Sequence, residues 1–283
     1  MIKLIFANRD DPLLVQNGPY KPFTLSHIIV ILILFQLVCL AVRQSRHKEY
    51  RIRYKRVCKA YKFLVFLNIL RFVWDWHTGC FNIKEDLPLQ LCGIQMFAIP
   101  LALYTQRIKS DPISRPAFPK FNAISKKIHK IGIYAIEFVY AYGIIGFLLA
   151  LIFPATTLYD YPVFHLRSIQ SFLYHTTMGF IAFMLPHLNY RPRVYNIRKA
   201  YNSLILCTLF TGIVNISIGS NYLYTAKLPI RFDLLPWPTY LPFLFAFALG
   251  VGYLPYYIYD LVQEKYSDKD KETHSQAWDS PRF

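Results

Sequence analysis

Seven apolar stretches, each about long enough to cross a bilayer, constrain this chain more than any other feature. A membrane-spanning helix needs roughly 20 mostly apolar residues. The stretches cover residues 23–42, 63–79, 88–106, 131–153, 165–185, 201–220 and 238–261. We therefore predict an all-α polytopic membrane protein with seven transmembrane helices. Residues 1–262 would form a single seven-helix membrane domain, and residues 263–283 a polar cytosolic tail.

The composition agrees with alternating apolar spans and basic loops. Hydrophobic residues make up 54% of the chain and charged residues 17%, yet 32 Lys and Arg face only 16 Asp and Glu. This balance excludes a soluble enzyme and a disordered chain. The five cysteines show no CxxC or Cys/His zinc spacing, so neither a disulfide scaffold nor a metal finger is indicated. The positive charge lies in short loops, which favours contact with lipid headgroups over nucleic acid.

The positive charges also predict the orientation of the spans. Twenty-four Lys and Arg lie in residues 43–62, 107–130, 187–200 and 262–283, and six lie on the other side. Cytoplasmic loops carry the excess of Lys and Arg, so we predict an external N-terminus and a cytosolic C-terminus. The three prolines of segment 110–121 predict an irregular loop. No targeting signal is recognisable, and the first span lacks a cleavage site, so we expect a bacterial cytoplasmic membrane.

Ionisable residues inside the second and fourth spans need partners. Arg71 and Asp75 are four residues apart on one helix face, which predicts an ion pair. The pair either stabilises the bundle or forms a wall of a polar cavity, and both roles are compatible. Replacing Arg71 alone should then leave Asp75 without its partner. Glu137 in the fourth span would either pair with a loop lysine such as Lys130 or be neutralised by protonation.

The third and fifth spans contain the residue types suited to nucleophilic chemistry. In the third, Pro88 fits a first helical turn, and Cys92 shares a face with Gln95. A cysteine in a membrane helix is either a small packing residue or a nucleophile. The fifth span is the most polar, because it contains Arg167, Gln170 and His175. A histidine there is either a hydrogen-bonded structural group or part of a site.

In the predicted topology, the polar residues of five spans gather in the outer half of the membrane. They include Asp75, Cys92, His165, Asn215 and Asn221. Polar residues that serve only helix packing would be scattered over both halves of the membrane. We therefore expect a polar cavity that opens toward the outer leaflet.

A thiol and an imidazole in such a cavity suffice for acyl transfer through a thioester. A third group should orient the imidazole, donors should face the developing oxyanion, and a cation should favour the thiolate. Asp75 or Asn215 could orient the imidazole. Gln90, Gln95 or Asn221 could donate to the oxyanion. Arg71 or Arg167 could favour the thiolate. The serine-elbow, Walker and zinc-protease motifs are absent from the sequence.

Four runs in order resemble a known family. They are LPLQLCGIQ (87–95), SIQSFLYHTTMGF (168–180), NISIGSNYLYTAKLP (215–229) and PWPTYLP (236–242). Together they resemble the YwaF-like integral membrane family, which includes eukaryotic transmembrane protein 164. The resemblance covers nearly all seven spans.

The resemblance implies a seven-helix fold distantly similar to the androgen-induced Thr/His-type lipid hydrolases. For the eukaryotic branch it implies a lipid acyltransferase that moves acyl chains onto lysophospholipids, with Cys92 as the nucleophile and His175 as the base. Asn221, Tyr222 and Lys227 match a further family element that would support the site. The chain departs from the family run L-P-L-H-L-C because Gln90 replaces the histidine.

The leading hypothesis is thus an acyltransferase or acyl-ester hydrolase acting on phospholipid or lysophospholipid, without metal or organic cofactor and without nucleic acid. Two alternatives remain. Arg71, Asp75, Glu137 and His175 would bind a solute or relay protons in a transporter, although the spans offer no inverted repeat. In the second alternative, the chain is an accessory subunit of a membrane complex. The oligomeric state is open.

Overall fold

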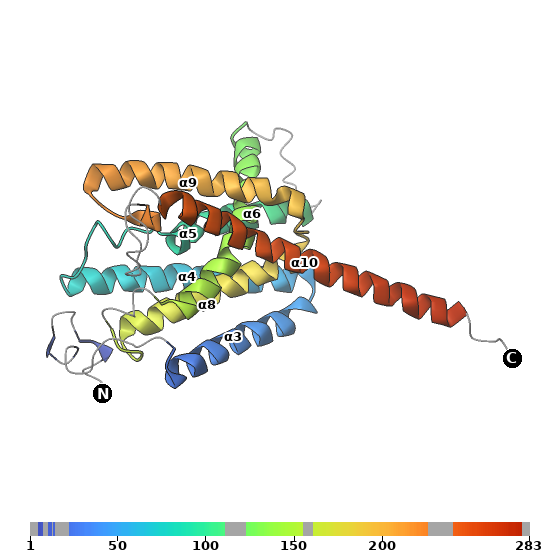
Figure 1. Ribbon diagram of the computed structural model, residues 1–283, viewed down its shortest axis with the longest axis horizontal. Coiled ribbons are helices and arrows are strands. Elements are labelled where there is room, and N and C mark those ends of the chain that lie inside the picture. Colours follow the sequence, from blue (N-terminus) through green and yellow to red (C-terminus); the bar gives the residue numbers. More distant parts are fainter. Residues whose placement is uncertain are drawn as a thin grey trace.

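The computed structural model describes residues 5–7, 11–12, 14, 23–110, 123–154, 161–225 and 240–278. Over these ranges the protein is helical and contains no strand. The α-helices are α3 (Leu25–Arg46), α4 (Tyr50–His77), α5 (Leu91–Ser110), α6 (Ala123–Ile152), α8 (Leu166–Met184), α9 (Ile197–Ile218) and α10 (Tyr240–Trp278). Short 3₁₀ turns cover Leu185–Leu188, Val194–Asn196 and Tyr222–Tyr224. Figure 1 shows the helices gathered into one bundle, with the end of α10 projecting beyond it.

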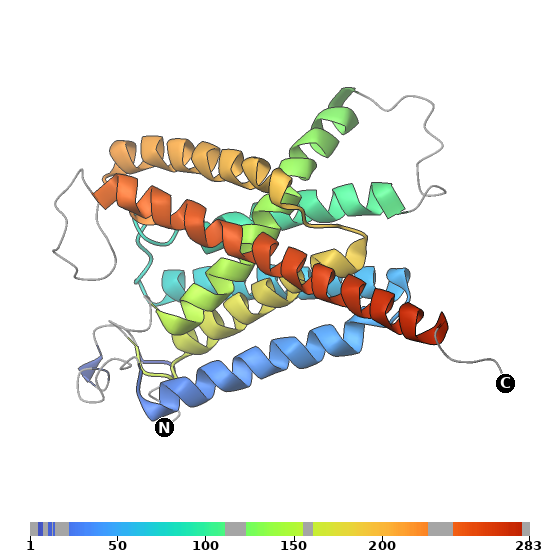
Figure 2. The same ribbon diagram turned by 45° about the vertical axis from the view of Figure 1, so that its right-hand side comes forward.

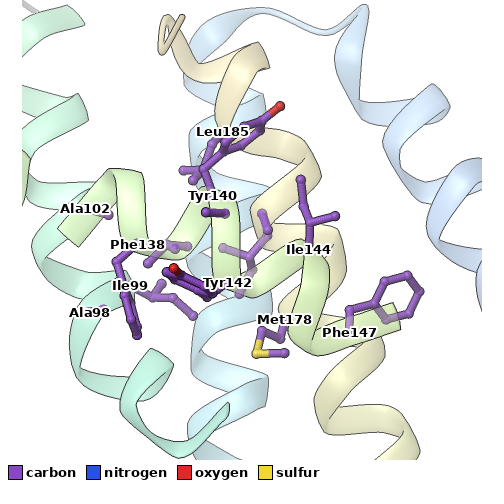
Figure 3. Packing of buried hydrophobic residues seen from close by; sticks show 14 of the residues in the cluster. Ala98, Ile99, Ala102, Phe138, Tyr140, Tyr142, Ile144, Phe147, Met178 and Leu185 are labelled. Atoms are coloured by element: carbon purple, nitrogen blue, oxygen red, sulfur yellow. The ribbon is translucent and has the colours of Figure 1, made fainter. Parts of the chain in front are cut away.

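Helix α6 is the centre of the bundle. It packs against α5, α8, α9 and α10, and it crosses between the other helices in Figure 2. The approach of α6 to α8 is close, because a Cβ added at Gly143 would lie 2.9 Å from the Cβ of Ala182. Small residues allow membrane helices to pack in this way. Side chains from α5, α6 and α8, including Ile99, Tyr142 and Met178, fill the space around this crossing (Figure 3).

Helix boundaries follow local sequence signals. Helix α4 contains neither glycine nor proline, and it ends just before Gly79, which has a φ of +70°. Helix α9 ends at Gly219, which is left-handed at φ 66°. Glycine adopts this conformation without the steric cost of a Cβ and so commonly ends helices.

Three boundaries differ from the sequence prediction. Helix α4 begins at Tyr50, so most of the predicted 43–62 loop is helical. Pro88 lies in the turn before α5 and not in its first helical turn, since α5 begins at Leu91. Helix α10 continues to Trp278, well into the predicted tail. Charged residues have good helix propensity, and so a polar segment extends an apolar helix without a break. Residues 111–121 of the predicted irregular loop lie outside the described ranges.

Four of the seven helices are long and apolar enough to cross a bilayer over Leu25–Arg46, Ile124–Ile152, Val194–Ile218 and Tyr240–Glu264. Helices α4, α5 and α8, which the sequence also predicts to span, are not among them. Polar side chains in α4 and α8 lower their mean hydropathy. Asp75 of α4 and Gln170 of α8 are buried inside the protein, where such groups avoid lipid.

Candidate functional site

Helices α4, α5 and α8 bring the predicted site residues together at one end of the bundle. Cys92 is the second residue of α5, and His175 lies in the middle of α8. Their side chains lie close enough for each to act electrostatically on the other. Both residues are partly accessible at the surface of the protein. The sequence placed them on different spans, and the fold makes them neighbours.

The orientation of the His175 ring follows from its other contact. Its Nδ1 lies 2.7 Å from the carbonyl oxygen of Ser171. A carbonyl only accepts hydrogen bonds, so Nδ1 carries the proton and donates. In the neutral ring this leaves Nε2 with a lone pair, which is the form that accepts a proton. The orienting group is therefore a backbone carbonyl one turn earlier in α8.

Neither side chain that the sequence offered for orienting His175 does so. The carboxylate of Asp75 lies 2.9 Å from Nη1 of Arg167. The amide of Asn215 donates to the carbonyl of Tyr222 at 2.8 Å. Asp75 is thus occupied by charge pairing, and Asn215 by loop structure.

The backbone around Cys92 is held from two sides. The hydroxyl of Tyr174, next to His175 in α8, donates to the Cys92 carbonyl at 2.9 Å. A Cβ added at Gly93 would lie 2.6 Å from the carbonyl carbon of Pro88, so this position has no room for a side chain. The thiol thus sits on the first turn of α5, where backbone amides lack helical acceptors.

Beside this pair lies a network of four charged residues, which confirms and extends the predicted Arg71–Asp75 pair. Arg71 contacts Asp75 at 3.5 Å and Asp86 at 3.1 Å. Arg167 contacts the same two carboxylates at 2.9 Å and 3.5 Å. Each arginine therefore bridges both acids, and the network joins α4, α8 and the segment between α4 and α5.

Asp86 is the member that sequence reasoning missed. It lies in a short loop rather than a span, yet it is only 6% exposed, and its second oxygen accepts from the backbone amide of Asn82 at 2.8 Å. A signal for it existed. Arg71 and Arg167 are two cations inside predicted membrane spans, toward the outer ends of these spans. Asp75 supplies only one carboxylate for the two of them. A second acid nearby was needed to balance the charge.

The remaining family positions connect loops. Gln90 Oε1 accepts from the backbone amide of Leu223 at 3.0 Å, and the Tyr222 hydroxyl accepts from the amide of Leu87 at 3.0 Å. Asn215 Oδ1 accepts from the Tyr222 amide at 2.8 Å. Asn221 precedes the 3₁₀ turn. These contacts tie the end of α9 to the segment that leads into α5. Lys227 lies outside the described residues.

Two glutamines of the predicted set have contrasting surroundings. Gln170 Nε2 donates to the carbonyl of Leu67 at 3.2 Å, so it joins α8 to α4. Gln95 is fully buried, one turn after Cys92, and its amide has no hydrogen-bond partner among the described residues. A buried carboxamide without partners is costly. Gln95 is therefore a buried carboxamide with unused hydrogen-bonding groups, one helical turn from Cys92.

Glu137 lies elsewhere in the bundle, in α6. The sequence predicted a loop lysine as its partner, whereas its Oε2 accepts hydrogen bonds from the hydroxyls of Tyr190 and Tyr256, the latter at 2.8 Å. Among the described residues, no group of three or more His, Cys, Asp and Glu side chains is placed to hold a metal ion.

The family model of the TMEM164 family matches residues 22–256. The chain belongs to the TMEM164 family. The match covers most of the chain. It includes six of the described α-helices in full and the first part of α10, and it leaves out residues 1–21 and 257–283. Together with its apolar helices, it identifies the chain as an integral membrane protein and confirms the resemblance drawn from the four sequence runs. No curated protein and no solved structure matches this TMEM164-family chain significantly.

Proposed function

We propose that this protein transfers acyl groups between membrane lipids through a thioester on Cys92, with His175 as the general base. The observation that supports this proposal is the proximity of the Cys92 and His175 side chains, which is close enough for each to act electrostatically on the other. The backbone contact of Nδ1 leaves Nε2 as the proton acceptor. A nucleophile, a base and a group that orients the base are the minimal set for covalent acyl transfer.

The reaction would proceed in two steps. The His175 Nε2 accepts the thiol proton, and the Cys92 sulfur attacks the ester carbonyl of a phospholipid. The ester C–O bond breaks, the lysophospholipid oxygen takes the proton from the imidazolium, and a thioester remains. A hydroxyl of a second lysophospholipid then gives its proton to His175 and attacks the thioester, which restores the thiol. Water in place of that hydroxyl would make the protein an acyl-ester hydrolase.

Three features near Cys92 support stabilisation of the oxyanion in these steps. The first-turn amides of α5 point away from the helix body, and the positive end of the helix dipole lies there. The Gln95 carboxamide has no partner among the described residues and lies one turn from the thiol. It is therefore available as a donor if the substrate carbonyl reaches it. Arg71 adds positive charge near both Cys92 and His175.

The proposed substrates are phospholipids and lysophospholipids, which the surrounding membrane supplies. We also propose that all seven helices span, with the N-terminus outside and the C-terminus in the cytosol, because this arrangement agrees with the distribution of Lys and Arg. The site would then open toward the outer leaflet. Helices α4, α5 and α8 carry the site, and their ionisable groups Asp75 and Arg167 are paired inside the protein, as expected within a membrane bundle.

The test is trapping of the acyl-enzyme. Purified protein in phosphatidylcholine nanodiscs is incubated with a phospholipid carrying a labelled acyl chain, and acylated peptides are identified by mass spectrometry. We expect a hydroxylamine-sensitive adduct on Cys92. His175→Ala should lower its rate of formation by about a hundredfold or more, since general-base catalysis contributes 10²–10⁴-fold.

Cys207→Ser is the matched control, because Cys207 is a partly buried thiol in α9 that belongs to no part of the proposed site. It should acylate as the wild type does. Cys92→Ser should form no thioester. Equal acylation in wild type and His175→Ala, or adducts distributed over several cysteines, would contradict the proposal. Addition of lysophospholipid then separates transfer from hydrolysis by the product formed.

A further inference from the structure

A cavity lies at the other end of α8, away from Arg167. Its volume is about 410 Å³. It is bordered by α6, by the segment that follows α8 and by the beginning of α9. The lining residues are Ile133, Ile136, Glu137, Asn189, Tyr190, Arg191, Arg193, Tyr195, Asn196 and Lys199. Cavities of a few hundred Å³ are large enough for a small ligand or a lipid headgroup.

The charge of this cavity is unbalanced. Arg191, Arg193 and Lys199 line it, and their cationic groups form no ion pair with a carboxylate of any described residue. This differs from the other end of the bundle, where Arg71 and Arg167 are each bound to two carboxylates. Three cations and one carboxylate in the lining leave an excess of positive charge, which suits an anionic ligand.

The acidic residue in the lining, Glu137, is bound by tyrosine hydroxyls. Glu137 Oε2 accepts from the hydroxyls of Tyr190 and Tyr256. Burial, followed by the neighbouring Tyr256 and Glu137, raises the pKa of the Tyr190 phenol well above its usual range, so it stays protonated and donates. The carboxylate is therefore hydrogen-bonded to two phenols at the wall of the cavity.

The beginning of α9 adds further donors. Lys199 Nζ donates to Asn196 Oδ1 at 2.7 Å, which holds the ammonium over the first turn of the helix. The Asn196 side chain forms no capping bond to the backbone amides of that turn. The Ile197 amide donates to the Val194 carbonyl, so this turn contributes chiefly the positive end of the helix dipole, which favours a phosphate group.

An apolar stripe continues from the cavity along the outside of α9. Leu206 and Ile213 lie seven and fourteen residues after Lys199, so they share its helix face. They are 69% and 66% exposed. A ligand with a phosphate group in the cavity and acyl chains along this stripe would satisfy both surfaces. Exposed apolar side chains next to a basic pocket at a helix end are typical of anionic-lipid sites.

We propose that this cavity binds the phosphate group of an anionic phospholipid headgroup. Arg191, Arg193 and Lys199 contact the phosphate, and the acyl chains lie along α9. The site is separate from Cys92 and does not depend on acyl transfer. In the orientation indicated by the loop charges, it faces the cytosolic leaflet, where anionic lipids are concentrated.

The test measures lipid-dependent thermal stability in nanodiscs. The arms are phosphatidylcholine alone, phosphatidylcholine with phosphatidic acid, and phosphatidylcholine with inorganic phosphate in the buffer. We expect phosphatidic acid to raise the Tm in a saturable way and inorganic phosphate to have little effect. Equal stabilisation by inorganic phosphate would overturn the lipid as the source of the phosphate, and no response to phosphatidic acid would overturn the site itself.

The variants are Arg191→Gln and Lys199→Gln, each of which should raise the half-saturating concentration of phosphatidic acid about tenfold, because a charge-assisted hydrogen bond is lost. Arg198→Gln is the matched control, since Arg198 is an exposed neighbour in α9 that does not line the cavity. An equal loss in Arg198→Gln would overturn the proposal in favour of diffuse attraction. Should Lys199→Gln fail to fold, the exposed Arg191 carries the test, and Cys92→Ser should bind phosphatidic acid normally.

Discussion

At the scale of single residues, the site depends on positions where the backbone leaves no room. Gly93 follows Cys92, and its Cα faces the backbone of Pro88 closely enough that a Cβ would meet three backbone atoms at 2.6–2.8 Å. A neighbouring side chain could rotate away from such a contact, but a backbone cannot do so cheaply. The turn before α5 and the thiol are thus placed by the absence of a side chain next to them.

We predict that Gly93→Ala lowers stability by about 1–3 kcal/mol, the range for overpacked sites. It should also slow acylation of Cys92, because the first turn of α5 must shift. Thermal unfolding in detergent and the trapping assay measure the two effects. Gly212→Ala is the control, since a Cβ at this position of α9 meets nothing within 4 Å. It should stabilise the helix by about 0.5–1 kcal/mol. Similar behaviour of the two variants would show that the Pro88 contact has no effect.

At the scale of the elements, the four-residue charge network fastens α4 to α8 and to the segment before α5. The sequence argument treated Arg71 as the partner on which Asp75 depends. The structure changes this expectation, because Arg167 lies at 2.9 Å from Asp75 and Arg71 at 3.5 Å. After loss of Arg71, Asp75 still has a guanidinium at hydrogen-bonding distance.

We therefore predict that Arg167→Ala destabilises the protein more than Arg71→Ala does. Removal of one partner from a buried ion pair costs about 3–5 kcal/mol, and Asp75 is only 1% exposed. The double variant Arg167→Ala/Asp75→Ala should cost less than the sum of its single variants, by about 0.5–3 kcal/mol. Thermal denaturation of the four proteins in detergent measures this coupling. Strict additivity would mean that the two side chains do not interact in the membrane protein.

At the scale of the whole molecule, the two ends of the bundle differ in charge and in chemistry. One end has paired arginines, Cys92 and His175, whereas the other has the basic cavity and the α3–α4 turn. Helix α4 alone separates these ends by about 40 Å, because its 28 residues rise 1.5 Å each. This length is sufficient to cross a bilayer.

The proposed orientation predicts that single cysteines at the two ends of α4 react from opposite sides. Lys84→Cys and Lys48→Cys, both at exposed positions, are made in a background without the five native cysteines. A membrane-impermeant maleimide should label residue 84 in intact cells and residue 48 only after the membrane is opened. Labelling of residue 48 in intact cells would contradict the cytosolic assignment of the basic loops.

The sequence alone determined the features that depend on one segment at a time. Hydropathy showed the membrane class and the approximate helices, four residue runs showed the family, and spacing along α4 showed that Arg71 and Asp75 are paired. These properties follow from local periodicity and composition, which are written along the chain.

The tertiary structure decided the features that depend on which helices are neighbours. It brought Cys92 to His175, assigned the orienting role to a backbone carbonyl, added Asp86 to the charge network, and gathered the cations of one loop and one helix around a cavity. Helix boundaries such as Tyr50 and Leu91 also differed from those expected. Contacts between distant segments depend on the crossing of helices around α6, and the residue types of one chain do not specify this crossing.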